Sequence, residues 1–390
     1  MTQVERWGLL EVQVDGPVAV EFRHEHDTAY VESFRDGDGW LIRFMPSLEG
    51  TWHYTLADEP RTVTCTPATT PGPVRRSGTT LRSADGTPYH PLTTTWFGSE
   101  DNWAEACRAL AASPFNRVRL RAHVDRLAFL DQQVQDLLAV EMAAEIVVRE
   151  VVPELVNRLA AYRNISWCLE ADTDVRGLAE LIAEQDSGRH LISVHAAADP
   201  GVPWLTHLSV PLENLRGVSA LRRDYAKPVH VDAAGYEGNG STPETSLTGQ
   251  EMLTRIWEGT VRGAHVAHGE WYVDADGGPW SGGGVRPTGV VAQRLRLLRE
   301  VLDELPDGVE PIDDYRDAPT LAVPGSYYLQ YLGEHRFPER TFSLPAGSYQ
   351  VEVLDVWNHS VRRTQETVSE TLTVRLPGTQ YQAIQIRRST

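Results

Sequence analysis

The sequence predicts a multidomain α/β plus β architecture, in which a (β/α)8 TIM barrel lies between two β-sandwich domains. Three observations support this prediction. A length of 390 residues fits two or three domains rather than one. Both ends of the chain contain short runs of alternating apolar and polar residues with turn signals between them. The middle alternates nearly continuous apolar runs with helical stretches. We therefore expect an N-terminal sandwich, a linker, a barrel and a C-terminal sandwich at residues 1–68, 69–80, 81–312 and 313–390.

The N-terminal domain is predicted from runs such as "WGLLEVQV", "AVEFRH" and "GTWHYTL", in which apolar and polar residues alternate. Several short strands within about 65 residues are typical of an immunoglobulin-like antiparallel sandwich. The stretch "RDGDG" lies between two β-rich runs and predicts a hairpin turn, because Asp-Gly accepts positive φ. The segment "TPATTPGPVRRSG" that follows is rich in Pro and Thr, as linkers are.

The barrel is predicted from eight apolar runs separated by helical stretches. Nearly continuous apolar strands indicate a parallel sheet that is covered on both faces. A barrel of roughly 225 residues is close to the lower size limit of this fold, so its loops must be short. The expected strands are "YHPLTTTWF", "NRVRLRA", "AEIVVRE", "ISWCLEA", "HLISVHA", "THLSV", "KPVHVDA" and "GAHVAHGE". The expected helices cover residues 100–113, 124–135, 151–163, 175–186, 249–263 and 290–305.

The C-terminal domain is predicted from a return to strand patterns after residue 318. Its runs are separated by Gly and Pro, as in an all-β domain. The expected strands are "SYYLQYLG", "RTFSLP", "SYQVEVLDVWNHSV", "ETLTVRLPG" and "YQAIQIRR".

Charge and composition exclude several classes of function. The formal charge of −18 argues against nucleic-acid binding, which needs clustered Lys and Arg. No stretch approaches the roughly 18 apolar residues of a membrane span, and the N-terminus lacks a signal-peptide pattern. The three cysteines are widely spaced and odd in number, so we expect a reduced, cytoplasmic protein. No cofactor or metal is expected, and "GGPWSGGG" lacks the Lys-Ser/Thr of a phosphate loop.

Motifs along nearly the whole chain resemble the apiosidase-like glycoside hydrolases. They include "VERWGLLEV", "ISWCLEADTD", "KPVHVD" followed by "YEGN", "HGEWY", "PWSGGG" and "YQVEVLDVWNHSV", in the order of that family. The resemblance implies the same three domains and a glycoside as substrate or ligand. It also implies two carboxylates at the carboxyl ends of the barrel strands, which in a retaining enzyme lie about 5–5.5 Å apart.

The resemblance assigns the catalytic positions residue by residue. The general acid/base position, after the fourth strand, falls on Asp172; the alternative is that Asp172 or Asp174 only caps the next helix. The nucleophile position, three residues before Tyr-Glu-Gly, is occupied by Ala233. Glu237 and Glu270 are the candidates for the second carboxylate.

Further residues near the strand ends are candidates for substrate binding. Histidine and acidic side chains hydrogen-bond sugar hydroxyls, and aromatic rings stack on sugar faces. A purely structural role in the barrel core is the alternative for each of them. The candidates are Trp96, His195, His207, Asp232, Tyr236, His268, Trp271 and Trp280.

Two hypotheses about function follow. In the first, the protein is a glycoside hydrolase in which Asp172 acts with Glu237 or Glu270. In the second, it is a non-catalytic relative that binds carbohydrate or assembles with a partner, either a second copy or another protein. Ala233 and the short loops after the second and third strands favour the second hypothesis, because loops above the strands build the substrate pocket.

Overall fold

The computed structural model describes residues 2–312 and 317–389. The chain divides into two compact units. The predicted start of the C-terminal domain, residue 313, lies outside the described residues. The first unit comprises Met1–Tyr89, Ser99–Trp103 and Asn116–Ser209, and the second comprises His90–Gly98, Ala104–Phe115 and Val210–Thr390.

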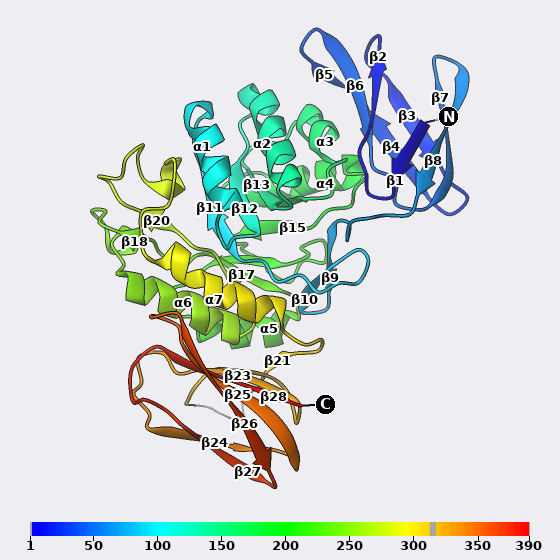
Figure 1. Ribbon diagram of the computed structural model, residues 1–390. Coiled ribbons are helices and arrows are strands. Elements are labelled where there is room, and N and C mark those ends of the chain that lie inside the picture. Colours follow the sequence, from blue (N-terminus) through cyan, green and yellow to red (C-terminus); the bar gives the residue numbers. More distant parts are fainter. Residues whose placement is uncertain (1, 313–316, 390) are drawn as a thin grey trace. The chain divides into compact units, whose positions relative to one another are not determined.

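The N-terminal part of the first unit, blue in Figure 1, consists of two β-sheets. One sheet has the strand order β1-β8-β7-β3-β4 and the other has the order β2-β6-β5. Trp52, Tyr54 and Leu56 alternate with exposed residues along β7 and belong to one apolar core with residues of both sheets. The strands are β1 (Thr2–Glu5), β2 (Leu10–Val14), β3 (Ala19–Arg23), β4 (Thr28–Glu32), β5 (Phe34–Asp36), β6 (Gly39–Phe44), β7 (Gly50–Leu56) and β8 (Glu59–Thr66).

The hairpin predicted at "RDGDG" is confirmed. Strands β5 and β6 pair antiparallel with Asp36 opposite Gly39, and Gly37 between them has a φ of +58°. The predicted linker contains regular structure of its own, because β9 (Val74–Ser77) and β10 (Thr80–Ser83) form an antiparallel pair there.

The middle of the chain forms the predicted barrel of parallel strands. The eight strands of the sheet occur in chain order, and a parallel bridge between Thr94 and His268 joins the first strand to the chain just after the last. All eight strands expected from the apolar runs are therefore confirmed. They are β11 (Thr93–Thr95), β12 (Arg117–Arg121), β13 (Ala143–Val148), β14 (Ile165–Glu170), β15 (Ile192–His195), β16 (Leu208–Pro211), β17 (Val229–Ala233) and β19 (Ala264–Val266).

Helices follow most of these strands. In the first unit, α2 contacts β13 and α4 contacts β14 (Figure 1). The six expected helices are present, together with α5, which the sequence analysis does not name. Helix α5 has a single buried residue, Val218, so its apolar face is narrow. The helices are α1 (Glu100–Ala111), α2 (Leu127–Ala139), α3 (Pro153–Leu159), α4 (Val175–Gln185), α5 (Gly217–Tyr225), α6 (Gly249–Val261) and α7 (Val291–Asp303).

The C-terminal part of the second unit is an antiparallel β domain, orange to red in Figure 1. A six-stranded sheet has the order β21-β22-β23-β28-β25-β26, and β24 pairs with β27. Phe342, Tyr349 and Ile384 are fully buried in its core. The strands are β21 (Glu310–Ile312), β22 (Thr320–Val323), β23 (Tyr327–Tyr331), β24 (Glu339–Ser343), β25 (Gly347–Asp355), β26 (Ser360–Val368), β27 (Thr371–Arg375) and β28 (Gln382–Arg388).

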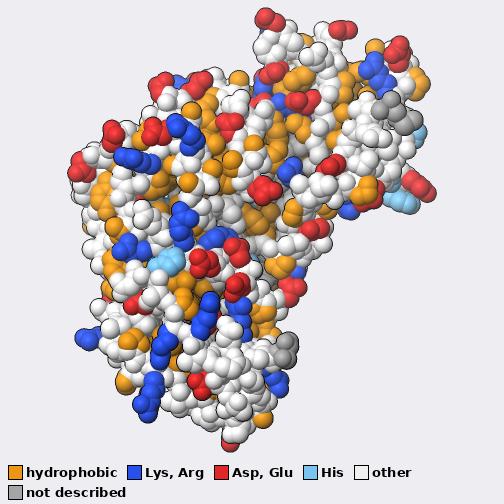
Figure 2. Space-filling model, in the orientation of Figure 1, with side chains coloured by type: hydrophobic (Ala, Val, Ile, Leu, Met, Phe, Trp, Pro, Cys, Tyr) orange, Lys and Arg blue, Asp and Glu red, His pale blue; other side chains and the backbone are white. Residues whose placement is uncertain are grey.

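The surface carries charges of both signs. On the face shown in Figure 2, acidic and basic side chains are interspersed rather than segregated. Among the described residues, no helix has the length and apolar character that crossing a membrane would require.

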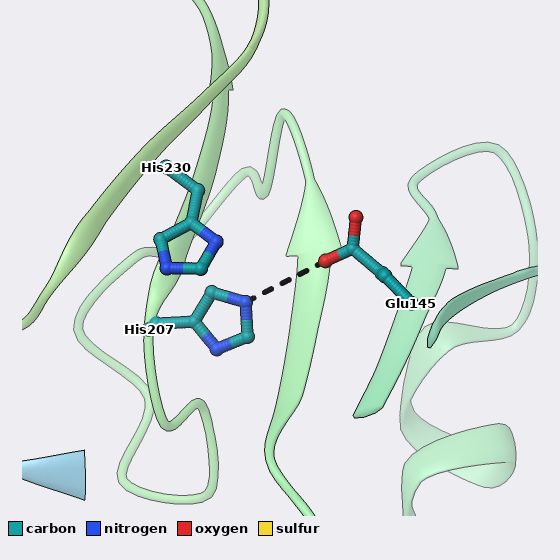
Figure 3. Close-up of side chains that lie close together, drawn as sticks. All are labelled: Glu145, His207 and His230. Carbon is teal, nitrogen blue, oxygen red and sulfur yellow. Dashed lines mark ion pairs between the residues drawn. The ribbon is translucent and has the colours of Figure 1, made fainter. Parts of the chain in front are cut away.

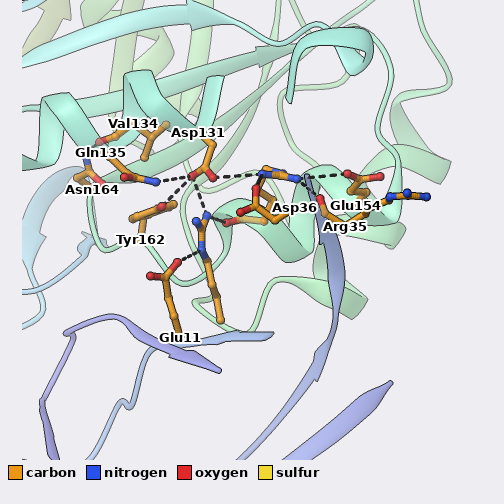
Figure 4. Close-up of polar contacts among 11 residues, drawn as sticks. Glu11, Arg35, Asp36, Asp131, Val134, Gln135, Glu154, Tyr162 and Asn164 are labelled. Carbon is orange, nitrogen blue, oxygen red and sulfur yellow. Dashed lines mark hydrogen bonds and ion pairs between the residues drawn. The ribbon is translucent and has the colours of Figure 1, made fainter. Parts of the chain in front are cut away.

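A buried ionic network joins the N-terminal sandwich to two barrel helices within the first unit (Figure 4). Asp131 on α2 accepts hydrogen bonds from Arg43 of β6 at 2.7 Å, from Arg158 of α3 at 3.3 Å and from the Tyr162 hydroxyl at 2.7 Å. Asp131, Arg43 and Arg158 are each at most 4% exposed. Burial alone would lower the pKa of Arg43, but the adjacent Asp131 carboxylate raises it above its ordinary value. Asp131 is therefore the shared acceptor of two buried cations.

We expect Asp131→Ala to lower the free energy of unfolding by about 3–5 kcal/mol, because two buried guanidinium groups lose their buried partner and keep only the more exposed acids Glu11, Asp36 and Glu154. Urea denaturation of the full chain measures this change. Glu180→Ala is the matched control, because Glu180 and its partner Arg176 have side chains 71% and 85% exposed. The control should change stability by less than about 0.5 kcal/mol. Equal effects of the two variants would contradict the role of the network.

Candidate functional site

In the first unit, Asp172 lies two residues beyond the carboxyl end of β14. Its side chain is 62% exposed and accepts a hydrogen bond from Arg149 Nη2 at 2.6 Å. Glu170, the last residue of β14, also forms an ion pair with Arg149. A second arginine, Arg121 at the end of β12, has its Nη2 atom 3.7 Å from Glu170 Oε1. Two acids and two arginines thus gather at the ends of three adjacent strands.

The residue that caps helix α4 is Asp174 and not Asp172. Asp174 is the N-cap of α4, and its Oδ1 atom accepts a hydrogen bond from the backbone N–H of Gly177 at 3.1 Å. Asp172 is therefore available to solvent beside Arg149.

Ala233 is the last residue of β17, and its side chain is only partly buried. The preceding Asp232 is 5% exposed. The expected nucleophile position therefore carries a methyl group that is neither packed into the core nor able to donate or accept a proton.

Glu237 and Glu270 lie next to each other in the second unit. The short parallel strands β18 (Glu237–Gly238) and β20 (Glu270–Trp271) pair with the two glutamates in register. Both residues are 0% exposed. Neither carboxylate therefore reaches solvent.

Backbone N–H groups at the start of α7 hold Glu237. Its Oε1 atom accepts hydrogen bonds from Val290 N at 2.8 Å and from the Tyr272 hydroxyl at 3.3 Å. Its Oε2 atom accepts one from Val291 N at 3.1 Å. A carboxylate at this point is favoured, because the N-terminus of a helix presents unpaired N–H donors and positive dipole charge.

The same segment encloses Glu270. Its Oε1 atom accepts hydrogen bonds from the backbone N–H and the hydroxyl of Thr288, at 2.5 and 2.9 Å. Burial raises the pKa of Glu270, and the neighbouring Glu237 adds to that rise. Gly289 packs between the two carboxylates so closely that a Cβ atom there would lie 2.3 Å from Glu237 Oε2 and 2.8 Å from Glu270 Oε2. Residues 288–291 would have to move before either glutamate could touch a substrate.

Three further candidates of the second unit are buried. Trp96, His268 and Trp280 are each at most 1% exposed. Thr94 Oγ1 accepts a hydrogen bond from Trp280 Nε1 at 2.8 Å and lies 3.2 Å from His268 Nδ1. Burial lowers the pKa of His268 to about 3, so its ring is neutral at physiological pH.

Tyr236 and Trp271 differ from these residues because both side chains are partly exposed. Their rings lie edge to face, with centroids 6.2 Å apart. This pair offers a partly solvent-facing aromatic surface in the second unit.

The two histidine candidates of the first unit are also placed differently. His195 is partly exposed at the end of β15, and its Nδ1 atom lies 3.1 Å from Ser209 Oγ. His207 is fully buried, and its Nε2 atom lies 3.8 Å from Glu145 Oε1 (Figure 3). His207 is therefore part of a buried charge network of the barrel.

Glu145 is the centre of that network. Arg117 pairs with Glu145 Oε1, and Arg119 Nε donates to Oε2 at 2.6 Å. Burial alone would raise the pKa of Glu145, but the two guanidinium groups hold it well below its ordinary range. These residues, like Arg149 and Glu170, are not among the candidates predicted from the sequence. Their only signal is a charged residue inside an otherwise apolar strand run, as in "NRVRLRA" and "AEIVVRE".

We expect Glu145→Gln to lower the free energy of unfolding at pH 7 by about 3–5 kcal/mol, because two buried arginines lose a charged partner. The depressed pKa adds a pH dependence. The carboxylate stabilises the folded state above its unfolded pKa of about 4.3 and loses this effect as the pH falls toward the folded pKa. The difference between wild type and variant should therefore shrink by roughly 1 kcal/mol between pH 5 and pH 3.5.

Urea denaturation at several pH values measures this difference, with exposed Glu180→Gln as the control. A gap between wild type and Glu145→Gln that is small at pH 7, or that widens in acid, would contradict the charge network.

Comparisons with known proteins agree with this architecture. Residues 3–59 match a family described as a domain of unknown function, DUF5060, and residues 316–387 match another, DUF5605. No curated protein matches the chain in sequence.

Solved structures resemble the chain over much greater lengths. A protein from Bacteroides vulgatus ATCC 8482, inferred to be a glycoside hydrolase, has a TM-score of 0.89 and 23% identity, with 100% of both chains covered. A glycoside hydrolase family 5 protein from the same strain has a TM-score of 0.67 and 14% identity, covering 82% of this chain and 93% of that one. Another glycoside hydrolase has a TM-score of 0.66 and 13% identity, covering 82% and 97%. The chain thus has the fold of these proteins, a parallel eight-stranded barrel with N- and C-terminal β domains.

Proposed function

We propose that the protein is a non-catalytic relative of the apiosidase-like glycoside hydrolases that binds a carbohydrate at the carboxyl ends of its barrel strands. One observation argues against hydrolysis. Of the four positions that the resemblance assigns to catalysis, Asp172 alone places a carboxylate in solvent. Glu237 and Glu270 are buried, and position 233 is alanine. Both the retaining and the inverting mechanism canonically use two carboxylates that flank the glycosidic bond.

Carbohydrate binding is supported by polar groups at the strand ends of the first unit. Arg149, Glu170 and Asp172 offer charged donors and acceptors at the face where barrels of this kind bind their ligands. Sugar hydroxyl groups both donate and accept, so paired acids and arginines suit them. His195 adds an imidazole at the end of the next strand.

In the second unit, considered by itself, Tyr236 and Trp271 offer an aromatic surface that suits a sugar. Stacking of a sugar on an aromatic ring requires a ring that is open on one side, and these two candidates are partly exposed. Trp96 and Trp280 are buried and donate their indole N–H groups within the fold, so they serve the barrel core.

Hydrolysis is the second candidate function, and the exposure of Asp172 favours it. A solvent-facing acid at the acid/base position could protonate a leaving group if another carboxylate reached the ligand. The test below therefore measures turnover as well as binding.

We expect a matching glycoside or oligosaccharide to raise the melting temperature of the full chain without being hydrolysed. A ligand at 100 times its dissociation constant stabilises the folded state by about 2.7 kcal/mol. A panel of neutral and acidic oligosaccharides, screened by thermal unfolding and then by calorimetry, identifies the ligand. The same panel, with aryl glycosides added, is assayed for released sugar.

The variant Arg149→Ala should weaken binding about tenfold or more, which corresponds to about 1.4 kcal/mol. Arg176→Ala, an exposed arginine on the adjacent helix α4, is the matched control and should bind as wild type does. Turnover that disappears in Asp172→Asn would establish the enzyme instead. A panel in which no carbohydrate stabilises the protein would contradict the binding proposal.

A further inference from the structure

Three buried side chains of the second unit converge on one point. Glu237, His268 and Glu270 each offer a ligand atom, and these atoms all lie within 4.8 Å of one another. All three residues are 0% exposed. They lie on or beside β18 and β20, under the start of α7.

This cluster has an unbalanced charge. Two carboxylates are buried side by side, and among the described residues no Lys or Arg forms an ion pair with either of them. The other groups that face them are the hydroxyls of Tyr272 and Thr288 and the backbone N–H groups of residues 288–291. These are dipoles rather than full charges. Burying two negative charges so close together is strongly unfavourable without a proton or a cation between them.

Two atoms of the cluster lack hydrogen-bond partners. Glu270 Oε2 and His268 Nε2 are both buried and unpaired within the described part of the chain. They lie 4.0 Å apart, which is too far for a direct hydrogen bond. Buried polar atoms are nearly always paired, so a third partner between these two would satisfy both.

Thr94 and Trp280 orient the imidazole ring from the other side. Thr94 Oγ1, itself an acceptor for Trp280 Nε1, lies 3.2 Å from His268 Nδ1 and 3.4 Å from the His268 carbonyl oxygen. If the hydroxyl donates to that carbonyl, the Nδ1–H group donates to Thr94 and the lone pair of Nε2 faces Glu270. Histidines that bind metals are held in this manner, with the second ring nitrogen donating to a fixed acceptor.

We propose that Glu237, His268 and Glu270 bind one divalent transition-metal ion. One neutral imidazole and two carboxylates suit Zn²⁺ or Mn²⁺. Ligand atoms around a tetrahedral Zn²⁺ lie about 3.3 Å apart, so small side-chain rotations close the site. The ion neutralises the paired carboxylates and ties β18 and β20 to the start of α7. Its role is structural and does not depend on the proposed function.

The test measures metal content and stability of the full chain. The protein is treated with a chelator, dialysed against ZnCl₂ or MnCl₂ and then against metal-free buffer, and analysed by mass spectrometry for metal. Because the partly exposed His24 and the exposed His26 on the N-terminal domain could bind Zn²⁺ weakly, the background is measured in a protein carrying His24→Ala and His26→Ala. We expect one ion per chain in that background and a higher melting temperature with the metal than without it.

Glu270→Gln, which keeps the shape of the side chain, should abolish this binding, whereas the exposed His359→Ala should leave it unchanged. Thr94→Val keeps the ligands but removes the acceptor that orients His268, and should weaken binding about 10–100-fold. If Glu270→Gln does not fold, the metal content of Thr94→Val tests the proposal in its place. Two results would overturn the proposal. One is that the background protein and Thr94→Val bind the same amount of metal when metal is limiting. The other is that neither protein binds metal.

Discussion

The structure depends on one constraint, that a carboxylate withdrawn from water must receive hydrogen bonds or a counter-charge. Three places in the chain meet it differently. Asp131 is shared by two arginines and a tyrosine, and Glu145 by two arginines. Glu237 and Glu270 instead accept hydrogen bonds from backbone N–H groups of residues 288–291 and from the hydroxyls of Tyr272 and Thr288, and Glu270 Oε2 has no hydrogen-bond partner among the described residues. The first case fixes the N-terminal sandwich on helices α2 and α3, the second organises neighbouring barrel strands, and the third holds the start of α7.

The same constraint distinguishes acidic residues that stabilise the fold from those that can contact a ligand. A buried carboxylate that is held by backbone donors stabilises the fold, but it cannot attack or protonate a substrate without giving up those bonds. Asp172 faces solvent beside Arg149 and does not stabilise the fold in this way. Glu237 and Glu270 are therefore explained by their contacts within the fold, and neither needs a catalytic role to account for its place.

The sequence was sufficient to predict the barrel because short, mostly apolar runs alternate regularly with helical stretches. It was insufficient for α5, a short and largely polar helix in which Val218 is the buried residue. The sequence also could not predict that Glu237 is enclosed by the start of α7. The donors Val290 and Val291 lie more than fifty residues away in the chain, and only tertiary contact brings them to the carboxylate. Likewise, the sequence places Glu170 at the end of a strand. Its ion pair with Arg149, however, depends on the register between β13 and β14, which the sequence does not show.

Carbodiimide labelling of carboxylates with glycine ethyl ester, read out by peptide mass spectrometry, tests the central claim most directly. This claim is that the glutamates retained at the strand ends are enclosed by the fold while Asp172 is open to a ligand. In the folded protein, Asp172 should be labelled, whereas Glu237 and Glu270 should be protected until the protein is unfolded in urea. Labelling of either glutamate in the folded state at a rate close to that of Asp172 would contradict the account.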